Sequence, residues 1–406
     1  MDNSPPFIVG LTAAALLSAS LTATADDLPS RQEMWKIIQQ QQKQIEALQK
    51  GAQTNTVDIA QANQKATAAV ELAEESQKSV SSAAVWASKT QLGGYGELHY
   101  NNLDSKDEID LHRVVLLLNH QFTDDVRFVS EIEFEHDGDE VEVEQAYVEF
   151  DLNQQTFAKA GVFLMPVGIL NETHEPATFY GVERNPVETN IIPTTWWVGG
   201  AVLGGQIGES GFSYDVAIHE GLKTDADNNY TVRKGRQKSS KADANKLAST
   251  ARIKWTGMPG VELAATAQYQ DDITQGTDDS AGEAWLFEAH AQIEHGPLAL
   301  RALYAYWDLD GDGPEAIGAD EQSGFYVEPS YKFSLFNQNL GIFGRYNQWD
   351  NQAGNGEVDS EKKQYTAGIN YWPIPDVVLK FDMRKQDNEG TQSNDNGWNL
   401  GVGYQF

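Results

Sequence analysis

The residue pattern with the most specific chemistry in this sequence is a short acidic run. Asp308-Leu309-Asp310-Gly311-Asp312-Gly313 matches the first half of a calcium-binding loop, in which carboxylates at alternate positions supply hard oxygen ligands. The twelfth position of such a loop requires a bidentate glutamate, and Ala319 stands there. Asp308, Asp310 and Asp312 are therefore a calcium candidate with half of the motif missing, and a solvated acidic loop is the alternative.

No other residues are spaced for catalysis or for metal binding. The eight histidines are scattered, and His99, His219 and His290 fall in separate candidate strands. A metal site needs converging ligands, which this spacing does not predict. Cysteine is absent and no nucleophile-elbow motif is present, which excludes thiol catalysis, disulfides and zinc-thiolate sites. We therefore expect no catalytic residue, no enzyme activity, no cofactor and no metal beyond the calcium candidate. The formal net charge of −31 argues against nucleic acid as a partner.

The elements that would position the charged side chains are strands with two different faces. From Thr90 to Phe406 polar and apolar residues alternate, which predicts about sixteen strands. The predicted strands begin near Gln91, Glu108, Val126, Val141, Thr156, Val198, Gly211, Leu247, Val261, Gly282, Pro297, Gln322, Asn339, Lys362, Asp376 and Asn396.

The last predicted strand is the clearest one. Trp398, Leu400, Val402, Tyr404 and Phe406 alternate with polar or small residues, and an aromatic residue closes the strand. This run looks like the C-terminal signal by which outer-membrane barrels are recognised for insertion. The barrel-assembly machinery is therefore an expected partner, with the apolar face toward lipid and the polar face toward a lumen.

The connections between the predicted strands alternate in length. Short turns such as Gly257–Gly260 and Gly296-Pro297 separate long polar stretches at 165–197, 221–246, 271–281, 308–321, 350–361 and 387–395. Short turns on one rim and long loops on the other are typical of outer-membrane barrels. The predicted fold is all-β, a 16-stranded antiparallel transmembrane β-barrel over residues 90–406, whose lumen is filled with water rather than with a packed core.

Two further segments precede the predicted barrel. Residues 1–25 resemble a secretory signal peptide, with an apolar stretch and Ala23-Thr24-Ala25 as the cleavage site, although Asp2 stands where a basic residue is usual. A mis-assigned start codon is the alternative. Residues 26–89 predict a periplasmic α-helical coiled coil. Its two core positions would hold Ile38, Ile45, Ala52, Ile59, Ala66 and Ala73, and Met34, Gln41, Leu48, Asn55, Ala62 and Ala69. A single helix lying against the barrel, or a partly disordered linker, remains open.

Several stretches together resemble the phosphate-selective porin O and P family of Gram-negative outer membranes. These stretches are Gly93–Leu98, Gln145–Phe150, Ala160–Gly168, Gly296–Arg301 and Gly368–Pro373, and their order is what carries the resemblance. The resemblance implies a homotrimer of sixteen-stranded barrels, each with its third loop folded inward to narrow the pore. In this sequence the third loop would be roughly residues 171–197.

The charges do not follow the phosphate selectivity that the resemblance implies. Acidic candidates for the lumen outnumber basic ones once Glu97, Glu188, Glu288, Glu294, Glu328 and Asp382 are counted with the acidic residues named next. The predicted acidic pore-lining residues are Glu131, Glu133, Glu135, Glu149, Glu172, Glu175 and Glu183. The predicted basic pore-lining residues are Arg127, Lys159, Arg252, Lys254, Arg301, Arg345, Lys380 and Arg384. Facing arcs of opposite charge would create a transverse field across the pore. Alternatively, the charges pair and hold the loop in place.

We therefore predict a passive diffusion channel for small hydrophilic solutes or ions, with a weak cation preference. It would lie in the outer membrane of a Gram-negative bacterium, among lipid and lipopolysaccharide. A basic run at 233–246 would either contact lipopolysaccharide phosphates or a neighbouring subunit, or be solvated. One alternative function is a structural tether that reaches the cell wall through the coiled coil. The other is a phosphate or anion-selective porin, as the resemblance suggests.

Overall fold

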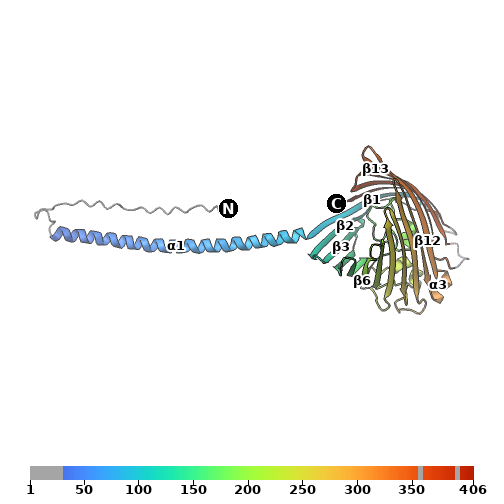
Figure 1. Ribbon diagram of the computed structural model, residues 1–406, viewed down its shortest axis with the longest axis horizontal. Helices are drawn as coiled ribbons and strands as arrows, with labels where there is room; N and C mark the ends of the chain where they lie inside the picture. Colours follow the sequence, from blue (N-terminus) through green and yellow to red (C-terminus); the bar gives the residue numbers. More distant parts are fainter. Residues whose placement is uncertain (1–30, 355–359, 389–393) are drawn as a thin grey trace. The chain divides into compact units, whose positions relative to one another are not determined.

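The computed structural model describes residues 31–354, 360–388 and 394–406 (Figure 1). The chain divides into two compact units, residues 1–83 and residues 84–406, and each is described by itself. The predicted signal peptide lies outside the described residues.

The first unit consists of most of helix α1, which runs over Arg31–Ser88. The predicted helix is thereby confirmed. Met34, Ile38, Ile45 and Leu48, which the heptad frame places at core positions, are exposed in the single chain. The coiled coil itself stays a prediction. Within the described residues, none of the helices combines the length and the apolarity that a helix needs to cross a bilayer.

The second unit is a closed antiparallel barrel in which every strand pairs with its neighbours along the chain and β1 pairs with β16. Its sixteen strands are β1 (Thr90–Leu103), β2 (Lys106–Thr123), β3 (Val126–Glu135), β4 (Glu140–Asp151), β5 (Thr156–Leu164), β6 (Trp197–Gln206), β7 (Phe212–His219), β8 (Ala248–Met258), β9 (Val261–Gln270), β10 (Ala284–His295), β11 (Leu298–Leu309), β12 (Glu321–Leu335), β13 (Gln338–Asp350), β14 (Lys362–Ile374), β15 (Val377–Asn388) and β16 (Gly397–Gln405). The predicted fold class is confirmed, and each strand begins within two residues of its predicted start.

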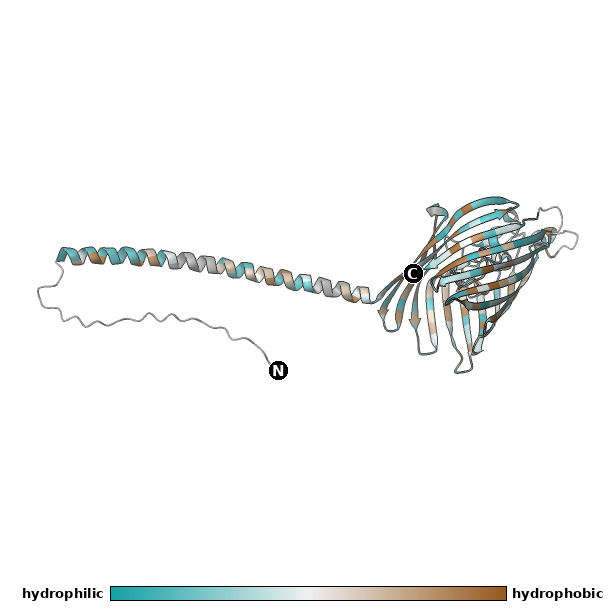
Figure 2. Cartoon of the chain, turned by 90° about the horizontal axis from the view of Figure 1, so that it is seen from above, coloured by the Kyte–Doolittle hydropathy of each residue, from teal (hydrophilic) through white to brown (hydrophobic). Residues whose placement is uncertain are grey.

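The two faces of the barrel differ as the alternation predicts. In β16, Leu400 and Val402 are 44% and 41% exposed on the outer face, whereas Asn399 is 1% exposed on the inner face. Figure 2 shows the resulting alternation of apolar and polar bands along the strands. Since side chains alternate with a period of two, one register fixes the outward and inward sets of a whole strand.

A β-bulge interrupts this alternation between β1 and β2. Glu97 pairs with Arg113 and Leu98 pairs with Leu111, so the ladder skips His112. The extra residue lets His112 and Arg113 both turn toward the interior, since a bulge re-aims the side chains beside it. This settles the direction of Arg113, which the apolar run after it leaves undecided in the sequence.

The connections alternate in length as predicted. Two-residue turns at 124–125, 259–260 and 296–297 lie on one rim, the turn side. The opposite rim, the loop side, carries the long connections, among them loop L3 (residues 165–196) and loop L4 (residues 220–247). Three short helices, α2 (Pro186–Asn190), η2 (Ala226–Asn228) and η3 (Val232–Gly235), lie within these two loops.

Part of the interior is packed rather than hydrated. Met165, Ile191, Ile192 and Trp196 of L3 are fully buried in an apolar cluster that also contains Trp307 of β11. The indole nitrogen of Trp307 donates to the carbonyl of Ile191 over 2.8 Å. The expectation of an interior filled only with water is therefore incomplete, because L3 and its neighbours fill one sector with side chains.

Candidate functional site

Loop L3 lies inside the barrel, because its hydrogen bonds reach inward-facing side chains on opposite walls. On one wall, Arg301 of β11 donates to the carbonyl of Thr178 over 2.9 Å. Arg345 of β13 donates to the carbonyl of Tyr180 over 3.2 Å. Asn370 of β14 donates to the carbonyl of Phe179 over 3.0 Å.

On the other wall, His174 of L3 is held by strands β2 to β4. Its Nε2 lies 3.1 Å from the carboxylate of Glu144 and 3.6 Å from that of Glu131. Arg113 of β2 donates to the carbonyl of His174 over 2.6 Å. β3 and β11 stand eight places apart in the ring of sixteen strands, so L3 crosses the lumen from one side to the other.

Two polar side chains of L3 hold the two ends of the loop where the loop leaves the barrel wall. Asn171 donates to the carbonyls of Met165 and Trp196 over 2.8 and 2.9 Å, and it accepts from the backbone N–H of Trp196 over 2.7 Å. Asn171 thereby joins the first and last residues of the loop. Glu188 in α2 accepts from the backbone N–H groups of Ile169 and Leu170 over 3.0 and 2.6 Å. These bonds give L3 a defined shape instead of leaving it solvated.

The predicted acidic residues lie on the lumen face of β3 and β4 and in L3. Glu131 and Glu133 are buried in β3, and Glu135 follows them on the same face. Glu149 of β4 pairs with Arg127 of β3. The remaining three belong to L3: Glu172 pairs with Arg252, Glu183 lies 3.2 Å from His99, and the carbonyl of Glu175 accepts from the backbone N–H of Thr178.

Most of the predicted basic residues are engaged with L3 or with neighbouring carboxylates. Besides the contacts already given, Arg127 also pairs with Asp151, Lys254 with Glu262, Arg345 with Glu328 and Arg384 with Asp395. The Nζ of Lys380 lies 3.5 Å from the centre of the Phe179 ring, and that of Lys159 lies over the rings of Tyr147 and Phe163. These contacts favour the alternative in which charges hold the loop in place.

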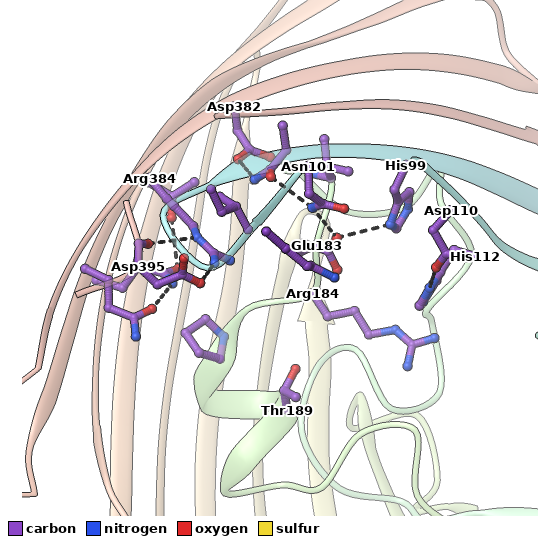
Figure 3. A pocket seen from close by; sticks show the side chains of 18 of the residues that line it. His99, Asn101, Asp110, His112, Glu183, Arg184, Thr189, Asp382, Arg384 and Asp395 are labelled. Carbon is purple, nitrogen blue, oxygen red and sulfur yellow. Dashed lines mark hydrogen bonds and ion pairs between the residues drawn. The ribbon is translucent and has the colours of Figure 1, made fainter. Parts of the chain in front are cut away.

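Two cavities flank L3. The loop-side cavity has a volume of about 450 Å³ and is lined by residues of β1, β2, L3 and β13 to β16 (Figure 3). The turn-side cavity has a volume of about 780 Å³ and is lined by residues near the β4–β5 and β6–β7 turns. In Figure 3, Glu183 of L3 reaches Asn101 and His99 of β1 across the loop-side cavity.

Loop L4 contributes basic residues to the lumen that were not predicted from the sequence to lie there. Arg233 donates to the carbonyls of Thr189 and Thr194 in L3 over 2.7 and 2.9 Å, and Arg236 donates to the carbonyl of Thr195. Burial, together with the nearby guanidinium groups of Arg236 and Arg184, lowers the pKa of Arg233 to about 9. Arg233 still carries its charge at neutral pH.

This arginine group (Arg184, Arg233 and Arg236) faces acidic residues of β3 and β4. Lys238 of L4 pairs with Glu142, and Glu142 lies within one cluster of carboxylates with Glu133 and Glu135. The sequence expectation of a solvated or lipopolysaccharide-binding basic run is therefore wrong for Arg233 and Arg236. Their contacts are long-range and leave no local signal.

Three groups of possible metal ligands occur among the described residues: Asp110, His112 and His136; Glu131, Glu144 and His174; and Glu133, Glu135 and Glu142. Asp308, Asp310 and Asp312 are in none of these groups. The group with two histidines was not predicted from the sequence, because His136 lies in the connection after β3, more than twenty residues from Asp110 and His112 of β2, and the bulge at His112 has no sequence signal.

The C-terminal strand has the lipid-facing surface that the predicted insertion signal requires. Trp398 packs edge-on against Tyr100 at 5.2 Å between ring centres, and Phe406 is 71% exposed. Recognition of this strand by assembly machinery stays a prediction.

A closed sixteen-stranded barrel with an apolar outside and a polar interior defines the class of porin-like outer-membrane channels. The family "Phosphate-selective porin O and P" matches residues 91–406, and the chain belongs to that family. Membership points to a channel rather than to an enzyme.

The chain is also similar to individual proteins. A protein of Aquifex aeolicus (strain VF5) is 30% identical over 348 residues, which cover 75% of this chain and 77% of the relative. The anion-selective porin from Comamonas acidovorans has a TM-score of 0.56 at 11% identity, over 78% of this chain and 99% of that one. The trimer form of OmpT from Vibrio cholerae has a TM-score of 0.52 at 12% identity, over 78% of this chain and 99% of that one. At these identities the two structures support the fold alone.

Proposed function

We propose that this protein is a passive diffusion channel of the Gram-negative outer membrane whose pore is narrowed by L3. The observation that carries the proposal is the set of L3 contacts to opposite walls, from His174 at β3 and β4 to Arg301 at β11. A loop held at both walls leaves solutes only the space beside it. The two cavities on either side of L3, with volumes of about 450 and 780 Å³, support such a path.

We also propose a weak cation preference, which the charges that line the cavities support. In the loop-side cavity six carboxylates stand against five permanent cations: Glu97, Glu108, Asp110, Glu183, Asp382 and Asp395 against Lys106, Arg184, Arg233, Arg345 and Arg384. In the turn-side cavity four stand against three: Asp125, Asp151, Glu172 and Asp215 against Lys159, Arg252 and Lys254. His99 lies between Glu97 and Glu183 and offsets the difference in the loop-side cavity when it is protonated, so the excess of negative charge is clearest in the turn-side cavity and the preference is small.

The reversal potential in a potassium chloride gradient tests this preference. The purified full chain is inserted into a planar bilayer with a tenfold salt gradient. The reversal potential is expected to be small and to have the sign of a cation-selective pore. A pronounced anion preference would contradict the proposal and would favour the second candidate, an anion or phosphate channel. That candidate is supported by the arginine group of L3 and L4, and the neighbour from Comamonas acidovorans is described as anion-selective.

For the assembly we propose a homotrimer in which α1 forms a periplasmic coiled coil. The exposed residues Met34, Ile38, Ile45 and Leu48 form the apolar seam of α1, and a solved neighbour is described as a trimer. Burying such a seam between identical helices is the usual way to stabilise them.

Deletion of residues 26–85 separates the roles of the two units. The barrel is expected to conduct as before, whereas the mass of the assembly in detergent falls or becomes dependent on concentration. If the tether is the main function, the full chain conducts poorly and the deletion affects only attachment to the cell wall. An unchanged trimer would show that the barrels associate without the helix.

A further inference from the structure

Three metal-binding side chains converge at the loop-side mouth of the lumen. Asp110 and His112 belong to β2, and His136 belongs to the short helix η1 (His136–Gly138) between β3 and β4. The Nδ1 of His112 lies 3.3 Å from the carboxylate of Asp110, and the Nδ1 of His136 lies 3.0 Å from the same oxygen. The two imidazole rings are 5.8 Å apart at an interplanar angle of 73°.

Two backbone features create this convergence. Asp110 and His112 lie two residues apart and so share one face of β2, and the β-bulge lets that face turn inward although Arg113 points inward as well. His136 has a φ of 48°, in the left-handed region that non-glycine residues adopt rarely. Together these two features point both Nδ1 atoms at one carboxylate.

A further histidine supports the cluster without joining it. The ring of His99 stacks on that of His112 with centres 4.7 Å apart. Its own nitrogens lie 3.2 Å from Glu97 and 3.2 Å from Glu183, so they are occupied by carboxylates. Figure 3 shows His99 beside Asp110 and His112. His99 therefore positions the His112 ring.

The donor atoms suit a borderline transition metal. Two imidazole nitrogens and one carboxylate oxygen are the ligands that Zn²⁺, Ni²⁺ and Cu²⁺ accept, whereas Ca²⁺ and Mg²⁺ require mostly oxygen. Ligands about 2.0–2.1 Å from a tetrahedral Zn²⁺ are separated by roughly 3.3 Å from one another. The nitrogen–oxygen distances of 3.0 and 3.3 Å already lie near that spacing.

The cluster is accessible from the lumen. The side chains of Asp110, His112 and His136 are 17%, 25% and 49% exposed, and all three line the loop-side cavity. Three protein ligands with an open side leave a coordination position for water or a solute, which is typical of exchangeable rather than structural sites.

We propose that Asp110, His112 and His136 form a binding site for a first-row divalent transition-metal ion, with Zn²⁺ as the representative, at the loop-side mouth of the pore. The bound ion adds two positive charges to the cavity that Glu97 and Glu183 also line. It therefore lowers the conductance for cations, and the channel responds to metal in the medium outside the cell. This goes beyond the proposed diffusion function and remains testable if the ion preference of the pore is the reverse of the one proposed.

Calorimetric titration of the purified full chain in detergent with ZnCl₂ tests the site directly. We expect one Zn²⁺ per chain, with MgCl₂ and CaCl₂ giving at least tenfold weaker binding. The informative variants are His136→Asn and Asp110→Asn. Asparagine tolerates the left-handed conformation at position 136, so the first variant removes the imidazole without disturbing the turn. Each is expected to weaken Zn²⁺ binding at least tenfold.

His295→Gln is the matched control, because His295 is an exposed histidine at the turn-side end of β10 and belongs to none of the ligand groups. Its Zn²⁺ affinity is expected to equal that of the original chain. In bilayers, Zn²⁺ added on the loop side is expected to reduce the potassium current of the original chain and not that of His136→Asn. Zn²⁺ binding that is absent in the original chain, or that persists in both His136→Asn and Asp110→Asn, would overturn the proposal.

Discussion

Arg113 connects three parts of the molecule that are distant in sequence. Its Nε donates to Glu97 of β1 over 2.7 Å, its Nη2 donates to the carbonyl of His174 in L3, and its Nη1 lies 3.5 Å from Glu133 of β3. The side chain is fully buried. Removing one member of a buried ion pair leaves its partner charged and desolvated, which costs more than the pair itself contributes.

Replacement of Arg113 by Gln is therefore expected to lower the free energy of unfolding by about 3 kcal/mol, the usual cost of breaking a buried pair. Urea-induced unfolding in detergent micelles measures this change. Arg301→Gln is the control, because the contact of Arg301 with L3 is exposed, and its loss is expected to cost under about 1 kcal/mol. Equal unfolding midpoints for the two variants would contradict the structural role of Arg113.

His174 makes the attachment of L3 dependent on pH. Burial disfavours the charged imidazolium, but the carboxylates of Glu144 and Glu131 outweigh burial and raise the pKa of His174 to about 9. Arg113 donates to the backbone carbonyl of His174, and Tyr95 packs edge-on against its ring; neither reverses the direction of the pKa shift. Because the pKa is raised in the folded state, the stabilisation is complete below about pH 6.5 and is lost as the pH rises through 9.

The variant His174→Gln isolates that contribution. The difference in unfolding free energy between the original chain and the variant is expected to be largest near pH 6 and to shrink toward pH 9.5. Urea unfolding at several pH values provides the measurement. A difference that stays constant over this range would show that His174 is neutral in the folded protein.

At the level of elements, L3 depends on the bonds that join its two ends. Asn171→Ala removes the hydrogen bonds to the carbonyls of Met165 and Trp196 and the one from the Trp196 N–H. Because these bonds are buried, their loss is expected to reduce the free energy that holds L3 in its ordered conformation by about 1–3 kcal/mol. A loosely attached L3 should give a larger and noisier single-channel conductance. Asn190→Ala in the same loop is the control, because Asn190 bonds only to Pro186 within α2. An unchanged conductance in Asn171→Ala would show that Asn171 does not hold the two ends of L3 together.

The strands were predictable from sequence, whereas the loops that shape the lumen were not. Alternation located every strand start within two residues, since each strand carries its own pattern of two faces. The bulge at His112 precedes an apolar run whose alternation is ambiguous, and the bulge at Glu144 follows a regular alternation of Glu and Val, so the sequence marks neither of them. The packing of Arg233 and Arg236 onto L3 depends on residues some forty positions away, and no local pattern reports such a contact.

For the whole molecule, the near balance of charge predicts a selectivity that salt weakens. Each cavity carries one more carboxylate than permanent cations among its described lining residues. The Debye length falls from about 10 Å at 0.1 M salt to about 3 Å at 1 M. The ratio of cation to anion permeability is therefore expected to approach one as salt rises over that range. Reversal potentials measured at a fixed gradient and increasing mean concentration provide the check. A ratio independent of salt would indicate a dehydrated binding site in the path instead.

The pairing of β1 with β16 has a consequence for biogenesis. The backbone N–H of Gly94 donates to the carbonyl of Phe406, and the N–H of Phe406 donates back to Gly94, so the seam joins nearly the two extremes of the barrel sequence. Until the final strand has been synthesised, the first strand has an unpaired edge, and such edges recruit foreign strands into aggregates. A chain cut short by a few residues would remain an open sheet. Closing this seam therefore removes the last unpaired strand edge of the barrel.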